Sequence, residues 1–104
     1  MGHDIFGFNK AGKEIAYARF SMGNHHAAIL YTILDANKYN AGVSGSADSS
    51  TYSVEQIEKA LNEFKESYLK DSSMINWNHE QILNFIQSCL ATAKKEGHVK
   101  VYFG

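Results

Sequence analysis

The stretch MGHDIFGFNKAGKEIAYARFSM, residues 1–22, decides the fold because it predicts a β-hairpin on which the rest of the chain packs. The turn is NKAG, residues 9–12. Asparagine at its first position and glycine at its fourth suit a type I turn followed by a left-handed residue. Such a turn sets the register of the two strands. The predicted cross-strand pairs are Gly7 with Ile15, Ile5 with Tyr17, and His3 with Arg19.

Alternation along each strand then divides the hairpin into two faces of different chemistry. The first face joins large aromatic residues to small ones, as expected beneath a layer of helices, and consists of Phe6, Phe8, Ala16, Ala18 and Phe20. The second face mixes titratable, cationic and aromatic groups, and consists of His3, Ile5, Ile15, Tyr17 and Arg19. We expect the second face to lie open, because burial in a core does not explain its composition.

Three helices are predicted after the hairpin. The first, His25–Ala36, is apolar on all sides and reads as a short buried helix. The second begins after Ser53, whose spacing to Gln56 is that of a capping box, and runs to about residue 69. The third begins after Asn78 and ends before Gly97, a glycine suited to a left-handed helix end.

The chain closes with a predicted strand, His98–Phe103, whose alternation sends Val99, Val101 and Phe103 to one side and His98, Lys100 and Tyr102 to the other. Residues 37–51 are predicted to form a long loop. The expected fold class is therefore α+β. Three helices pack on one face of a small three-stranded sheet, antiparallel or mixed, in the order β-β-α-α-α-β. Whether the last strand pairs with the first or the second is left open.

The composition limits the possible functions. A chain of 104 residues with a formal net charge of −1 predicts a single domain, residues 1–104, and disfavours both disorder and duplex nucleic-acid binding. The single cysteine, Cys89, excludes an internal disulfide and a cysteine-based zinc cluster. The sequence contains no run of about 20 apolar residues that would predict a membrane span, and the opening residues do not resemble a signal peptide. These features predict a cytoplasmic protein.

The open sheet face is the first candidate site. It would collect His3, Tyr17, Arg19, Lys100 and Tyr102. Arg19 is the only arginine, and its planar guanidinium suits a carboxylate or phosphate. Aromatic rings beside cations suit the stacking of a base. The same composition is also typical of plain surface or of a homodimer contact.

The second candidate site joins a helix start to a loop. Asn24 and His25 lie at the start of the first helix, where free N–H groups favour an anion. Gly42, Ser44 and Gly45 belong to a glycine- and serine-rich loop that lacks the P-loop spacing. Solvated histidines and a plain surface loop are the competing interpretations. No metal site, cofactor or catalytic residue is predicted from these patterns.

The segments MGHDI (residues 1–5), YNAGVSGS (39–46) and VYFG (101–104) together resemble a family of small, uncharacterised bacterial and phage-associated proteins. The resemblance implies that His3, Asp4, Gly42, Ser44, Gly45 and the terminal strand form one spatial unit. It implies no activity. Small phage proteins of this size can sequester nucleotide-derived immune signals, which is an analogy of size and setting.

The favoured hypothesis is a non-enzymatic binding module, a homo-oligomer, for a small anionic nucleotide-like ligand, with a phage-type sequestering (anti-defence) role. One alternative is a protein-interaction module whose sheet face meets a second copy or a host protein. The other is a small hydrolase that uses His3, His25 or His26 as a base near neutral pH.

Overall fold

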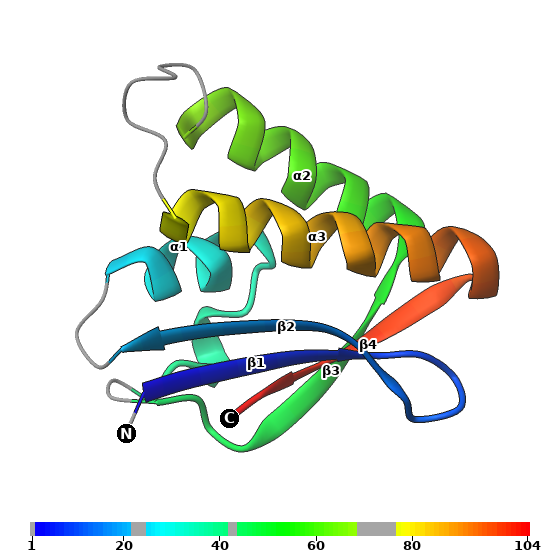
Figure 1. The fold of residues 1–104 in the computed structure, drawn as a ribbon, viewed down its shortest axis with the longest axis horizontal. Coiled ribbons are helices and arrows are strands. Elements are labelled where there is room, and N and C mark those ends of the chain that lie inside the picture. Colours follow the sequence, from blue (N-terminus) through cyan, green and yellow to red (C-terminus); the bar gives the residue numbers. More distant parts are fainter. Residues whose placement is uncertain (1, 22–24, 42–43, 69–76) are drawn as a thin grey trace.

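The computed structural model describes residues 2–21, 25–41, 44–68 and 77–104. In chain order the elements are β1 (Gly2–Phe8), β2 (Glu14–Ser21), α1 (His25–Ile33), the short 3-10 helix η1 (Asn37–Tyr39), β3 (Asp48–Ser53), α2 (Val54–Tyr68), α3 (Trp77–Glu96) and β4 (His98–Phe103). The α-helices lie on one side of a single sheet (Figure 1). The predicted α+β class, with helices on one face of the sheet, is confirmed.

The sheet has four strands in the order β2-β1-β4-β3, and each neighbouring pair is antiparallel. The predicted count of three strands is wrong, because β3 lies largely within the segment 37–51 that the sequence predicts as a loop. Only Tyr52 of β3 is buried, and the other five residues are serine, threonine or aspartate. A strand with so little hydrophobic alternation gives almost no signal in the sequence. The last strand, β4, pairs with β1 and with β3.

The hairpin turn is confirmed, but the register beyond it is wrong by one residue. Gly12 has a φ of 80° and donates its N–H to the Asn9 carbonyl at 3.0 Å. Phe8 pairs with Glu14, whereas Gly7 pairs with Ala16, so Ile15 is an extra residue, a β-bulge. A Cβ on Gly7 would lie 3.2 Å from Ile15 Cδ1, so the missing side chain makes room for the bulged residue.

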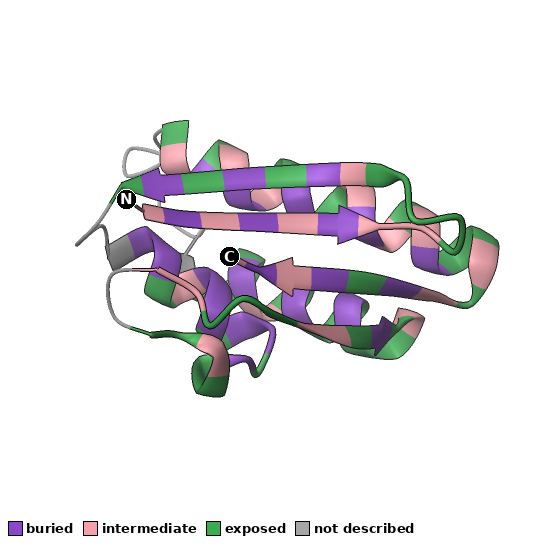
Figure 2. Ribbon diagram, turned by 90° about the horizontal axis from the view of Figure 1, so that it is seen from below, coloured by how far each residue is buried: buried purple, intermediate pink, exposed green. Residues whose placement is uncertain are grey.

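The bulge reverses the predicted faces of β1 and leaves those of β2 in place. His3 and Ile5, expected on the open face, are 3% and 0% exposed among the core residues. Phe6 and Phe8, expected beneath the helices, lie on the opposite face beside Tyr17. A one-residue change of register exchanges the two sides of a strand, which is the physical reason for both errors. Figure 2 shows the resulting alternation, of buried and intermediate residues along β1 and mainly of buried and exposed residues along β2.

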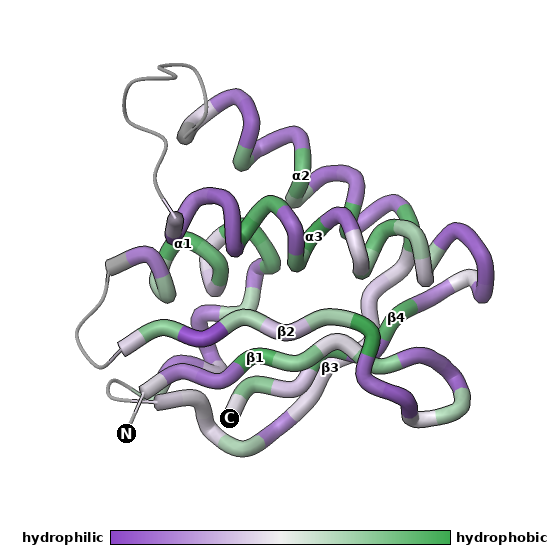
Figure 3. Tube along the Cα trace, in the orientation of Figure 1, coloured by the Kyte–Doolittle hydropathy of each residue, from purple (hydrophilic) through white to green (hydrophobic). Residues whose placement is uncertain are grey.

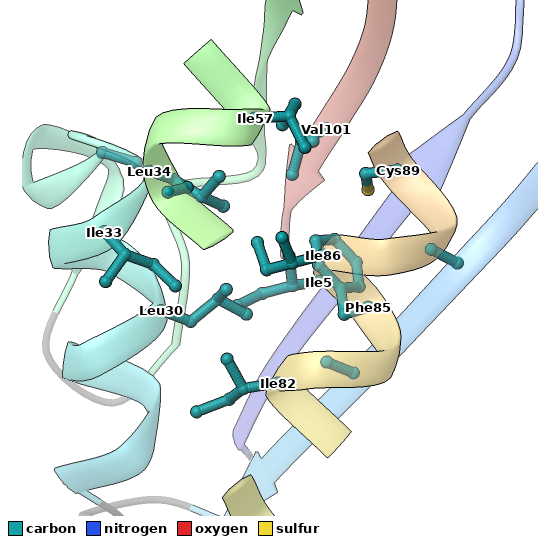
Figure 4. Packing of buried hydrophobic residues seen from close by; sticks show 14 of the residues in the cluster. Ile5, Leu30, Ile33, Leu34, Ile57, Ile82, Phe85, Ile86, Cys89 and Val101 are labelled. Atoms are coloured by element: carbon teal, nitrogen blue, oxygen red, sulfur yellow. The ribbon is translucent and has the colours of Figure 1, made fainter. Parts of the chain in front are cut away.

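The core lies between the helices and the inner face of the sheet. Ala18 and Phe20 of β2 and Val101 and Phe103 of β4 are buried there, as predicted. Figure 4 shows Ile5 among the core side chains that α1 and α3 contribute. In Figure 3 the hydrophobic segments of α2 and α3 face each other and the sheet, whereas the hairpin loop is largely hydrophilic. Packing of these amphipathic faces supplies most of the stability of such helices.

Local signals define several helix ends. The capping box is confirmed, since Ser53 N–H donates to Gln56 Oε1 at 2.8 Å and Gln56 N–H donates to Ser53 Oγ at 3.2 Å. Gly97 has a φ of 91° after α3, as expected of a left-handed helix end. Helix α1 ends at Ile33, earlier than predicted, because Asp35 takes a φ of 52° and the Ala36 N–H donates to the Tyr31 carbonyl at 2.7 Å. This is the hydrogen bond of a Schellman motif.

Candidate functional site

The outer face of the sheet carries four aromatic rings, Phe6, Phe8, Tyr17 and Tyr102, which we call the aromatic patch. Phe6 on β1 lies opposite Tyr17 on β2 and opposite Tyr102 on β4, so three rings form a row across three strands. The ring centroids of Phe6 lie 4.9 Å from Tyr17 and 6.1 Å from Tyr102. Among the described elements, no helix covers this face (Figures 1 and 2).

At one end of the aromatic patch, Asp4 connects Tyr17 to Arg19. The Tyr17 hydroxyl donates to Asp4 Oδ1 at 2.7 Å, and Arg19 Nε lies 3.7 Å from the same oxygen. The pKa of Tyr17 is raised above its ordinary value of 10.0, mainly because its hydroxyl donates to Asp4, and the charge of Glu14 acts in the same direction. The arginine that the sequence predicts to grip a ligand therefore has a carboxylate beside it already.

At the other end of the aromatic patch lies a shallow depression with a volume of about 660 Å³. Phe6, Phe8 and Tyr102 form its aromatic wall. Its charged lining comes from the hairpin loop and three strands, and consists of Lys10, Glu14 of β2, Lys100 of β4 and Asp48 of β3. Surfaces of this kind combine an apolar floor with a few polar groups that fix the orientation of a ligand.

His3 does not belong to the open face, so its predicted place there is wrong. Its ring is buried, with Nδ1 3.1 Å from the Tyr31 hydroxyl of α1. Burial raises the pKa of Tyr31 from 10.0 to about 12, so this hydroxyl stays protonated near neutral pH. The pair is a satisfied polar contact within the core, and it ties β1 to α1.

The second candidate site is only partly described. Asn24, Gly42 and the side chain of His25 lie outside the described residues. The backbone N–H of Gly45 donates to the Gly104 carbonyl at 3.0 Å, and the backbone N–H of Asp4 donates to the same oxygen at 3.1 Å. A Cβ on Gly45 would lie 2.4 Å from the Phe103 carbonyl oxygen, so glycine is needed for this close approach. Ser44 Oγ donates to the Gly45 carbonyl at 3.2 Å.

These contacts give the loop that contains Ser44 and Gly45 a structural role that does not depend on a ligand. Asp4, Gly45 and the end of the terminal strand form one unit held by backbone hydrogen bonds. The unit lies at the Asp4 end of β1, whereas the depression extends from Phe8 to Ala47 and Asp48 and is lined by neither Ser44 nor Gly45. The structure therefore brings Tyr17, Arg19, Lys100 and Tyr102 together on one face, but it does not bring Ser44 or Gly45 to the depression.

The sequence interpretation missed Phe6, Phe8 and Glu14 as members of the open face. Gly7 was the available signal, because an isolated glycine within a strand often marks a bulge or a close approach. A bulge on β2 would have turned both phenylalanines outward. Asp48 could not have been found in this way, since its place depends on the pairing of β3 with β4.

Other reactive groups lie in the interior. Burial raises the pKa of the Cys89 thiol from 9.0 to about 12, so it stays protonated and is not a nucleophile near neutral pH. His26 and His79 are buried, with ring centroids 4.9 Å apart. Within residues 2–21, 25–41, 44–68 and 77–104, no group of three or more histidine, cysteine, aspartate or glutamate residues is placed to hold a metal ion.

Protein-family models, curated proteins and solved structures were compared with the chain, and none of them matches. The resemblance to small phage-associated proteins therefore stays a prediction. In the part of the chain that the structure describes, no helix has the length and apolar character needed to cross a membrane.

Proposed function

We propose that this protein is a non-enzymatic binding module that holds a small anionic, nucleotide-like ligand on its open sheet face. The observation that carries the proposal is the row of rings formed by Tyr17, Phe6 and Tyr102 across three adjacent strands, with Tyr17 44% exposed. Exposed aromatic rings on a sheet provide stacking surfaces for bases, as in several single-strand binding folds. Contiguous apolar patches on a protein surface often mark binding sites, which favours a binding role for this face.

The anionic part of the ligand is assigned to the lysine side of the depression. Lys100 lies directly across from Phe8 on β4, and Lys10 lines the same depression from the hairpin loop. An ammonium group close to a stacked base is well placed for a phosphate. Arg19 lies beside Asp4, so we assign it to the support of Tyr17. The proposed ligand contacts are therefore Phe6, Phe8, Tyr17, Lys100 and Tyr102.

A module of this kind acts by lowering the free concentration of its ligand. Such sequestration fits the analogy with small phage proteins of this size, and it requires no catalytic group at the site. The alternative of a His-dependent hydrolase loses support for His3 and His26, which are 3% and 7% exposed, whereas the side chain of His25 lies outside the described residues. A general base must reach the proton that it removes.

Calorimetric titration with a panel of nucleoside monophosphates at low salt tests the proposal. We expect binding by the wild type and a loss of about 5- to 150-fold in Phe6→Ala, because stacking contributes about 1–3 kcal/mol per base. Trp77→Ala is the matched control, since Trp77 is an aromatic residue with 67% exposure at the start of α3. Lys100→Gln should weaken nucleotides more than the corresponding nucleosides. Absence of binding to every nucleotide refutes the proposal.

A second copy of the chain is the competing occupant of the aromatic patch. Light scattering on the wild type and on Tyr17→Glu separates the two, because a charge placed in a face-to-face dimer would dissociate it. A dimer that dissociates in Tyr17→Glu, together with no response to nucleotides, replaces the ligand-binding proposal with a homodimer interface.

A further inference from the structure

Phe8 lies between two side chains of opposite charge. It pairs with Glu14 on β2 and with Lys100 on β4, and all three residues line the depression. Directly opposite residues on neighbouring strands have Cβ atoms about 4.5–5.5 Å apart. A planar ring that rests on Phe8 therefore meets a carboxylate at one edge and an ammonium at the opposite edge.

We propose that this arrangement makes the site selective for bases that carry an exocyclic amino group, with Glu14 as the acceptor of that group. The inference rests on the proposed function, because it requires a base stacked on the aromatic patch. An ionised carboxylate only accepts hydrogen bonds. Adenine carries an amino donor at C6, cytosine carries one at C4, and guanine carries one at C2, whereas uracil and thymine carry carbonyl oxygens at both C2 and C4. Glu14 then favours the first three bases over uracil and thymine, whose single ring N–H donor lies between two carbonyl oxygens.

The same pair of charges sets the direction of the ligand. A phosphate placed near Glu14 would meet a like charge, whereas a phosphate placed near Lys100 meets an opposite one. Lys10 also lines the depression and adds positive charge. The base edge therefore points toward β2 and the phosphate points toward β4 or the hairpin loop.

Glu14 is a better acceptor than the other carboxylate of the depression. Asp48 Oδ1 already accepts the Ser49 backbone N–H at 2.7 Å. Glu14 is exposed and lines the depression directly opposite Phe8 of the aromatic patch. Glu14 also lies on the strand next to Phe8, so its carboxylate can lie at the edge of a stacked base.

Paired titrations with cytidine monophosphate and uridine monophosphate test the inference on the wild-type protein. The two ligands share ring size, sugar and phosphate, and they differ in an amino group against a carbonyl. We expect cytidine monophosphate to bind more tightly by roughly 5- to 100-fold, the discrimination of one good base contact. Adenosine against inosine monophosphate repeats the comparison with a purine.

Glu14→Gln supplies the second measurement, because an amide both donates and accepts. We expect the preference to fall below about threefold as uridine monophosphate gains a donor. Glu58→Gln on α2 makes the same change of charge away from the sheet face and should keep the preference. Equal binding of both ligands by the wild type overturns the inference and leaves the proposed function standing. An unchanged preference in Glu14→Gln overturns the role of Glu14, and no binding of any nucleotide overturns both proposals.

Discussion

Adjacent substitutions at Ile5 and Phe6 should have unequal effects on stability, and the order of the two effects tests the bulged register. Ile5 is 0% exposed, so Ile5→Ala removes a core side chain and should cost about 2–5 kcal/mol. Phe6 lies on the open face, where its nearest ring is Tyr17 at a centroid distance of 4.9 Å. Phe6→Ala loses mainly that aromatic contact, which is worth about 0.5–1.5 kcal/mol.

Urea unfolding followed by circular dichroism measures both effects. For a slope of about 1–3 kcal/mol per molar urea, a loss of 3 kcal/mol moves the midpoint by about 1 M or more. We expect the midpoint of Ile5→Ala to fall by this amount and that of Phe6→Ala to fall by less than half as much. Ile5→Val is a graded control and should cost about 0.5–1.5 kcal/mol. A register without the bulge reverses the order, so a larger loss in Phe6→Ala refutes the reasoning.

Three further outcomes follow from the packing of α3 against the sheet. Gly7→Ala would place a Cβ 3.0 Å from Cys89 Sγ, so we expect the free energy of unfolding to fall by about 1–2 kcal/mol. In a double-mutant cycle, Cys89→Ala should relieve this contact and give a favourable coupling of at least 0.5 kcal/mol. Additive losses would contradict the contact. The Gln81 side-chain amide accepts the backbone N–H of Arg19 at 2.7 Å and donates to the Arg19 carbonyl at 2.9 Å. Gln81→Ala should therefore lower the free energy of unfolding by about 1 kcal/mol in urea unfolding and promote self-association in light scattering. Gln87→Ala, a change at an exposed glutamine of the same helix, should have neither effect. Burial raises the pKa of the Cys89 thiol from 9.0 to about 12 in the folded protein, so its stabilising contribution is complete below pH 9 and is lost as the pH rises toward 12. Cys89→Ala should lack this part of the alkaline decrease in the free energy of unfolding. Equal decreases in both proteins would disprove the assignment.

Short-range patterns in the sequence predict the features that depend on a few neighbouring residues. The turn at residues 9–12, the Ser53–Gln56 capping box and the left-handed Gly97 are all present in the structure. Each depends on backbone hydrogen bonds and φ angles within four or five residues. The two sides of β4 are also as predicted, because its three large apolar residues, Val99, Val101 and Phe103, all lie on the buried side.

The faces of β1 could not be read in the same way. One side offers His3, Ile5 and Gly7, and the other offers Asp4, Phe6 and Phe8, so each side has one polar member. Because large apolar residues are usually buried, the sequence predicts that Phe6 and Phe8 face the core. This prediction is wrong because the solvent-facing side of β1 carries apolar rings. The position of β3 was missed for a different reason, since its pairing with β4 joins residues about 50 positions apart and leaves no local pattern.

The hydrogen bonds of Gln81 also bear on how a partner can approach the sheet. β2 is an edge strand, and the backbone N–H and carbonyl of Arg19 are both bonded to the amide of Gln81 from α3. A side chain in that place occupies the groups that an added strand would use, which is one way in which proteins protect a sheet edge. At Arg19, therefore, strand addition would first have to displace Gln81. The aromatic patch has no comparable cover from the described helices, so a ligand or a second copy meets less resistance on the face of the sheet than at this edge.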